Sequence, residues 1–183
     1  MDDTMLEKIL LGVWLTALAC LTASSTGAAQ GLLAYALGPS YFHDLQFDRF
    51  SIEDGLRSPL GASLVGVRAS WWIGLLTGPS LAYLALRERP LEEGARRFAR
   101  GVALTAALAV CAGIAGAFAA PLLFSATPDW AAWSQDPVGF ARAAASTGAA
   151  LGGATLGAIA AALALWRRPR PPEASRDAEY VPS

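Results

Sequence analysis

Four long apolar stretches constrain this chain more than any other feature. They cover about residues 9–37, 60–86, 101–124 and 138–166, and most of the charge lies between or outside them. Each is longer than the roughly 20 residues that an α-helix needs to cross the hydrocarbon core of a bilayer. Only 16% of the residues are charged, whereas soluble domains carry about 25%. We therefore expect an all-α membrane protein whose single domain, residues 1–166, has four transmembrane helices.

The basic residues predict the orientation of these helices. Residues 87–100 carry five arginines, and more follow the fourth stretch, whereas residues 125–137 carry no basic residue. Because basic loops face the cytoplasm, both termini are expected there, with residues 41–57 outside. The polar, proline-containing residues 167–183 are expected to form a disordered cytoplasmic tail. The predicted location is the bacterial cytoplasmic (inner) membrane, with the lipid bilayer as the surroundings of a multi-pass protein.

The first stretch has an alternative interpretation as a cleaved signal peptide that ends near residues 26–29. Its leader is acidic, however, and the apolar run resumes at Leu32. We therefore expect a retained transmembrane helix.

Residues 41–57 are the one place where aromatic and charged residues alternate densely, and they include the only histidine. The segment either lies in the interface as an amphipathic helix or forms a structured loop with buried rings. His43 and Asp44 could handle a proton or bind a metal, because histidine titrates near neutral pH and a carboxylate can orient it. A structural role is favoured, since no second histidine stands at ligand spacing. No metal site is predicted.

Arg68 and Gln30 are polar side chains within the apolar stretches. An ionised side chain there is costly unless it is paired or hydrated, so Arg68 is a functional candidate. It reaches the lipid headgroups or holds the outer loop in place, as we favour, or it pairs with a carboxylate of that loop. These carboxylates are Asp44, Asp48, Glu53 and Asp54. Gln30 either lines a polar path or, as we favour, bonds to a neighbouring helix.

Small residues at four-residue spacing predict how the helices associate. In a bilayer, association depends on close backbone approach through such residues. The third and fourth stretches are therefore expected to form a tight antiparallel pair, and a second protein could use the same faces. The glycines concerned are Gly113, Gly116, Gly148, Gly152, Gly153 and Gly157.

Motifs of catalysis are missing from the sequence. It has no phosphate-binding glycine loop, nucleophile elbow or cysteine-based redox motif, so neither an enzyme nor a cofactor is predicted. Cys20 and Cys111 each lie in an apolar run and are expected to be packing side chains, with a disulfide or metal pair as the alternative. The net charge of −1 gives no reason to expect nucleic-acid binding.

Residues 38–50 and 69–74 contain Pro-x-Tyr-Phe, Phe-x-x-Phe and Trp-Trp-x-Gly in this order. With the small residues 61–66 between them, they resemble a family of small bacterial four-helix membrane proteins over residues 38–74. The resemblance implies the four-helix architecture and no particular activity. The sequence departs from the family pattern at Ser40, where glutamate is usual, and at Gln30-Gly31, where a more polar segment would be expected.

These features favour a non-catalytic accessory or structural subunit that packs against other membrane subunits or a copy of itself. A small oligomeric transporter or channel that uses Arg68, Gln30 and the acidic loop is one alternative. An envelope sensor whose outer loop binds a ligand is another.

Overall fold

The computed structural model describes residues 3–87, 90–123 and 129–167, and this part of the chain contains helices and no strand. Its four long helices are α1 (Asp3–Leu37), α4 (Pro59–Leu86), α5 (Leu91–Leu123) and α6 (Pro137–Trp166). All four are long and apolar enough to cross a membrane. The predicted all-α architecture with four helices of membrane-spanning length is therefore confirmed.

Short helical turns connect the long helices at one end of the bundle. Between α1 and α4 they are α2 (Pro39–Tyr41), η1 (Phe42–Gln46), α3 (Phe47–Arg49) and η2 (Asp54–Leu56). We call residues 38–58 the cap. A further turn, η3 (Asp129–Ala131), precedes α6.

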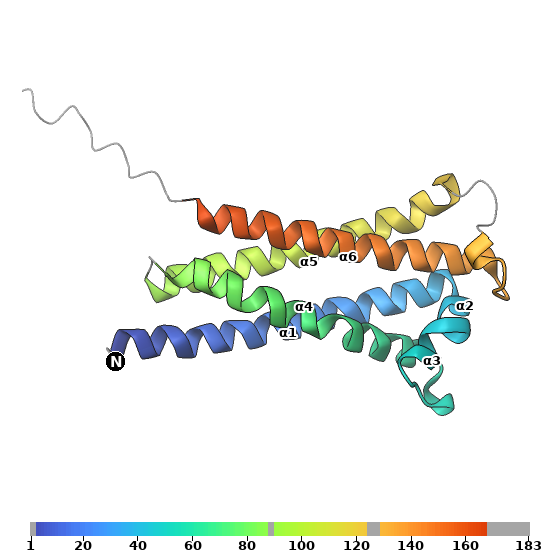
Figure 1. Cartoon of the computed structure of the whole chain (residues 1–183), viewed down its shortest axis with the longest axis horizontal. Coiled ribbons are helices and arrows are strands. Elements are labelled where there is room, and N and C mark those ends of the chain that lie inside the picture. The colour runs from blue at the N-terminus through green and yellow to red at the C-terminus, as the bar shows by residue number, and fades with distance from the viewer. Residues whose placement is uncertain (1–2, 88–89, 124–128, 168–183) are drawn as a thin grey trace, which may run out of the picture.

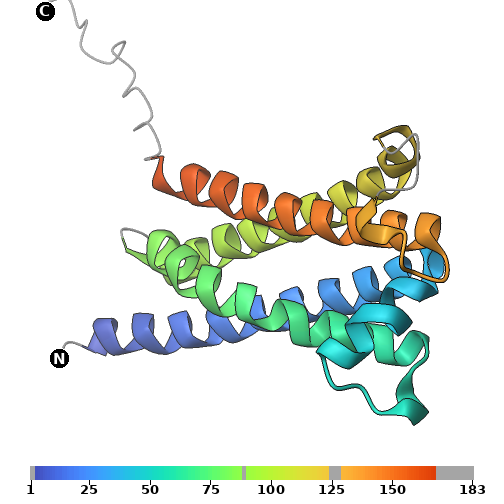
Figure 2. The ribbon, with the colours of Figure 1, turned by 45° about the vertical axis from the view of Figure 1, so that its right-hand side comes forward.

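The long helices alternate in direction, so the cap lies at one end of the bundle and both ends of the described chain lie at the other (Figures 1 and 2). We call these the cap end and the terminal end. Helix α1 packs along α4, and α5 packs along α6, which gives two hairpins. Within each hairpin the helices are in close contact, and the two hairpins touch each other much less.

Glycines bring the two backbones of the α1–α4 hairpin into contact. Along α4, small residues recur at every fourth position from Ala62 to Gly78. A Cβ added at Gly66 would overlap the carbonyl of Gly27, and one added at Gly74 would lie 2.5 Å from the Cα of Cys20. The rule of close approach through small residues therefore applies to α1 and α4 as well. The sequence predicted it only for the third and fourth apolar stretches, which form α5 and α6.

The glycines of the α5–α6 hairpin fall into two groups. Gly153 faces the Leu108 carbonyl, and Gly157 lies against Thr105, both on α5. From the other side, an added Cβ at Gly116 would lie 2.8 Å from the Ala145 carbonyl oxygen. Gly148 and Gly152 differ, because a Cβ added at either would meet nothing within 4 Å. Of the four α6 glycines named in the sequence analysis, only Gly153 and Gly157 therefore pack on α5.

The hairpins join at both ends of the bundle and at one point between. Buried side chains form one core cluster at the cap end and a second at the terminal end, around Phe47 and Phe98 respectively. Between the clusters, Gln30 Nε2 donates to Ser146 Oγ over 2.8 Å. Ser146 Oγ in turn donates to the Gly113 carbonyl over 2.9 Å. This chain of hydrogen bonds ties α1, α6 and α5 together, in the way favoured for Gln30.

The predicted arginine-rich loop is largely helical. Residues 91–100 form the first turns of α5, where Glu92 pairs with Arg96 at 3.6 Å and Glu93 pairs with Arg97 at 2.7 Å. Such pairs one turn apart stabilise a helix, and glutamates are favoured in its first turn. The predicted start at residue 101 is therefore the point where the charged residues end, whereas the helix itself begins at Leu91. Of the predicted disordered tail, residues 167–183, all but Arg167 lie outside the described residues.

Candidate functional site

The cap is a folded unit with buried aromatic rings. Tyr41, Phe42 and Phe47 are buried, and Tyr41 makes an edge-to-face contact with Phe140 of α6, ring centroids 5.2 Å apart. Burial raises the pKa of the Tyr41 hydroxyl above its ordinary value, against the opposing effect of the hydrogen bond that Gln46 donates. The structured loop with buried rings, one of the two forms expected for residues 41–57, is therefore the one observed.

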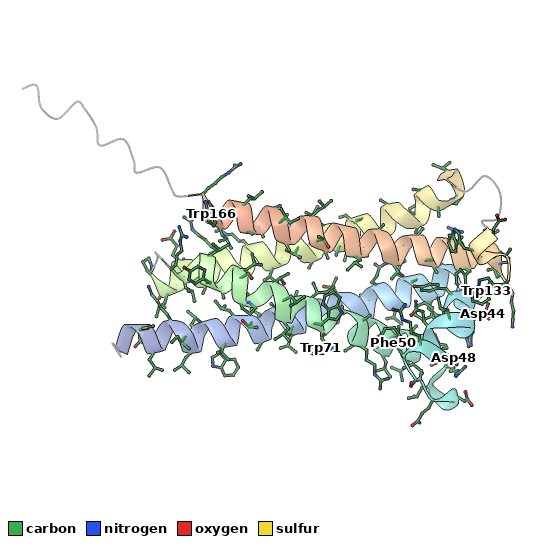
Figure 3. All side chains as sticks on the ribbon, viewed as in Figure 1. Asp44, Asp48, Phe50, Trp71, Trp133 and Trp166 are labelled. Carbon is green, nitrogen blue, oxygen red and sulfur yellow. The ribbon has the colours of Figure 1, made fainter. Side chains whose placement is uncertain are left out.

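Three of the four carboxylates of the cap bond to residues in or next to the cap. Arg57 pairs with Asp48 at 2.6 Å and with Asp54 at 3.0 Å. Asp44 accepts hydrogen bonds from the Ser134 hydroxyl at 2.8 Å and the Gln135 backbone N–H at 3.2 Å, which ties the cap to the α5–α6 connection. Figure 3 shows both Asp44 and Asp48 at the cap end. Glu53 is exposed beside η2.

His43 and Asp44 do not act as a pair in this structure. The imidazole Nε2 of His43 lies 3.2 Å from the Tyr35 hydroxyl, and its ring stacks edge-on against Phe47 with centroids 5.0 Å apart. Asp44 bonds instead to the α5–α6 connection. Within the described residues, no three potential metal-binding side chains lie together. The arrangement supports a structural role for both residues.

Arg68 bonds to a carbonyl of the cap and not to a carboxylate. Its Nη1 donates to the Phe50 carbonyl over 2.6 Å, and Figure 3 shows Phe50 at the inner edge of the cap. No ion pair of Arg68 is found in the part of the chain that the structure describes. The bond to the Phe50 carbonyl agrees with the favoured role of Arg68 in holding the outer loop. The alternative pairing with loop carboxylates is not seen among the described residues, where Asp48 and Asp54 pair with Arg57.

A cavity of about 530 Å³ lies between the two hairpins. It extends from Tyr41 and Phe42 of the cap-end cluster to Leu81 of the terminal-end cluster. Arg68 and Leu81 both line it and stand thirteen positions apart on α4, which corresponds to roughly 20 Å along a helix. Since half of the hydrocarbon core is about 15 Å thick, the cavity is long enough to pass the bilayer midplane.

The cavity opens between α4 and α6. On these helices the lining residues Trp72 and Leu151 are 43% and 50% exposed, and Gly148 between them in the lining is also exposed. The lining residues of α1 and α5 are half-buried or buried, so these helices form the back wall. Both flanks of the opening are helices long and apolar enough to cross a membrane.

The polar groups of the cavity are unevenly distributed. Two arginines, Arg49 of α3 and Arg68 of α4, line its cap end. Gln30 and several threonines line its middle, and the hydroxyl of Thr105 donates to a carbonyl of its own helix. No described lining residue carries a carboxylate. The site is therefore an apolar cavity with a cationic end.

The sequence analysis did not single out Arg49 or Arg142, and it gave Gly148 a different role. Arg49 lines the cavity, but its position in a mixed-charge loop gave no signal. Gly148 was expected to pack on a helix and instead borders the opening. Arg142 lies half-buried on α6, and its buried Nε has no hydrogen-bond partner in the described residues. The sequence could have pointed to Arg142, because it is a charged residue within an apolar stretch.

Comparison of the chain with protein-family models, curated proteins and solved structures finds no match. The resemblance of residues 38–74 to a bacterial family therefore stays a prediction. Function has to be inferred from the residues of the cavity and the cap.

Proposed function

We propose that this chain is a non-catalytic, multi-pass protein of the bacterial inner membrane that binds one amphiphile in the cavity between its hairpins. Both termini lie in the cytoplasm, and the cap lies outside, as the basic residues favour. In this orientation the cationic end of the cavity lies at the outer leaflet.

The observation that carries this proposal is the opening of a long apolar cavity toward the bilayer. Its volume of about 530 Å³ is within the range of roughly 300–1,000 Å³ for small-molecule sites. Most of its lining is apolar, and the residues at its opening are exposed. A hydrocarbon chain that enters from the side replaces lipid contacts with protein contacts along its whole length and needs no passage through water.

Two glycines on the same helix provide a matched test of this proposal. Gly148 lines the cavity, whereas Gly152, one turn further, does not. An added Cβ meets nothing within 4 Å at either position, so a leucine begins in open space at both. Gly148→Leu places its side chain in the opening, and Gly152→Leu places the same side chain outside the cavity.

The measurement is native mass spectrometry of the protein extracted in mild detergent, with bound amphiphile counted per chain. We expect the wild type and Gly152→Leu to retain one amphiphile, and Gly148→Leu to lose most of it. Equal retention by both variants, or no retained amphiphile in the wild type, would contradict the proposal. Melting curves of the three proteins serve as the folding control.

An accessory subunit is a second candidate function, supported by the exposed small residues of α6. Gly148 and Gly152 leave room for the backbone of another helix to approach. A stoichiometric membrane partner should then co-purify with the wild type and be lost from Gly152→Leu. The amphiphile would stay bound in that variant, so one substitution separates the two functions.

A further inference from the structure

Arg49 and Arg68 bring two positive charges to the cap end of the cavity. Both side chains are exposed and both line the cavity. Neither forms an ion pair with any residue that the structure describes. Arg68 uses Nη1 for the Phe50 carbonyl, and a guanidinium has five N–H donors in all, so most of its donors stay available.

The nearby acids do not neutralise these arginines. Asp48 and Asp54 pair with Arg57, and Asp44 bonds to Ser134 and the Gln135 backbone. The lining of the cavity contributes no carboxylate among the described residues. The described carboxylates of the cap therefore lie outside the cavity lining, whereas Arg49 and Arg68 present positive charge to it.

We propose that the amphiphile bound in this cavity carries an anionic, phosphate-bearing headgroup that Arg49 and Arg68 recognise. This inference rests on the proposed function and names the class of its ligand. Arginine donors match the oxygens of a phosphate group in geometry and charge. The apolar tail extends from the arginines toward Leu81, along the cavity lining.

The bond from Arg68 to the Phe50 carbonyl orients the headgroup site. It holds the guanidinium against the cap, at the point where the cavity meets the cap. Trp72 lies in the same lining, and its ring N–H donates to the Ala69 carbonyl over 2.6 Å. Tryptophan is typical of the level of the lipid headgroups, so the arginines lie at the depth where a phosphate group is found.

The test compares lipids with equal acyl chains and different headgroups. The protein is placed in detergent with equal amounts of phosphatidylglycerol and phosphatidylcholine, and native mass spectrometry gives the ratio of the two bound forms. The variants are Arg49→Gln, Arg68→Gln and the double variant. Arg100→Gln is the control, because Arg100 is an exposed arginine that does not line the cavity. Arg68→Lys keeps the charge and a donor for the Phe50 carbonyl.

We expect the wild type to prefer the anionic lipid. A basic residue near anionic lipid contributes a factor of about five, so each glutamine variant should lower the preference about fivefold and the double variant about twenty-fivefold. Arg100→Gln and Arg68→Lys should keep it. Arg49→Gln provides a test that is independent of the Phe50 contact, should Arg68→Gln disturb the cap.

Three results would overturn the inference. Unchanged headgroup preference in the double variant, with lipid still bound and still lost from Gly148→Leu, would refute the role of the arginines and leave the proposed function standing. No bound lipid in the wild type would refute both. If inorganic phosphate binds but displaces neither lipid, the arginines form an anion site that does not bind the amphiphile.

Discussion

The hydrogen bonds of Ser146 provide the sharpest stability prediction. Ser146 is fully buried, accepts from Gln30 of α1 and donates to the Gly113 carbonyl of α5. Ser146→Ala removes both bonds and adds no bulk. Interhelical hydrogen bonds in membranes average about 0.6 kcal/mol and reach about 1.7 kcal/mol. The unfolding free energy should therefore fall by about 1–3 kcal/mol.

The assay is unfolding in mixed micelles of increasing sodium dodecyl sulfate, followed by tryptophan fluorescence. Thr155→Val is the matched control, since the Thr155 hydroxyl is exposed and bonds only to the Leu151 carbonyl of its own helix. A double-mutant cycle with Gln30→Met isolates the bond between hairpins, which should appear as a coupling of about 0.6–1.7 kcal/mol. Equal stability of Ser146→Ala and Thr155→Val, or zero coupling, would refute this account of how the hairpins are joined.

Two further predictions concern the α1–α4 contact and the cap. Gly66→Ala should lower the unfolding free energy by roughly 1–3 kcal/mol, because its Cβ overlaps the Gly27 carbonyl. Gly12→Ala is the control, since an added Cβ there meets nothing within 4 Å and should not destabilise the protein. The same micelle titration measures both variants, and equal effects would contradict the close contact between α1 and α4. The raised pKa of Tyr41 means that the folded state keeps a proton that the unfolded state releases. Stability should therefore fall as the pH rises above about 10, the ordinary tyrosine value. Unfolding titrations at pH 9 to 11 should show a weaker loss in Tyr41→Phe than in the wild type, and an identical loss would contradict the cause given for the shift.

The four helices could be predicted because their length and apolar composition are properties of single segments. The exact starts could not, since polar residues do not end a helix. Residues 91–100 continue α5 beyond the apolar run, and the pairs between Glu92 and Arg96 and between Glu93 and Arg97 stabilise that extension. Apolar length therefore predicts the span and not the helix.

The close contact of α4 with α1 could have been predicted, because α4 follows the same spacing rule as the α6 glycines, with Gly66, Ser70, Gly74 and Gly78. The rule does not say which glycines meet a neighbour. Gly153 and Gly148 have similar sequence surroundings, yet one contacts α5 and the other borders the cavity. The two glycines stand five positions apart and so lie about 140° apart around the helix. The spacing rule does not say which of these faces meets α5.

The partners of the cap were the least predictable part. Asp44 bonds to Ser134, ninety positions away, and Arg57 pairs with two of the carboxylates that were considered as partners of Arg68. Both outcomes depend on how the two connections fold against each other. The loop looked acidic as a segment, whereas its surface toward the cavity is cationic, with Arg49 and Arg68 in the lining.

Mapping the position of a bound lipid tail tests the central claim most directly. A phosphatidylglycerol with a photoreactive diazirine in its acyl chain is added at low ratio to the protein, irradiated, and the labelled residues are identified by peptide mass spectrometry. On α5, Thr105 and Ala106 line the cavity, whereas Phe118 and Leu104 are exposed outside its lining, at 71% and 42%. We predict label on Thr105 and Ala106 that disappears in Gly148→Leu. Label confined to Leu104, Phe118 and other outward-facing residues would show that the tail stays outside the cavity and would contradict the account.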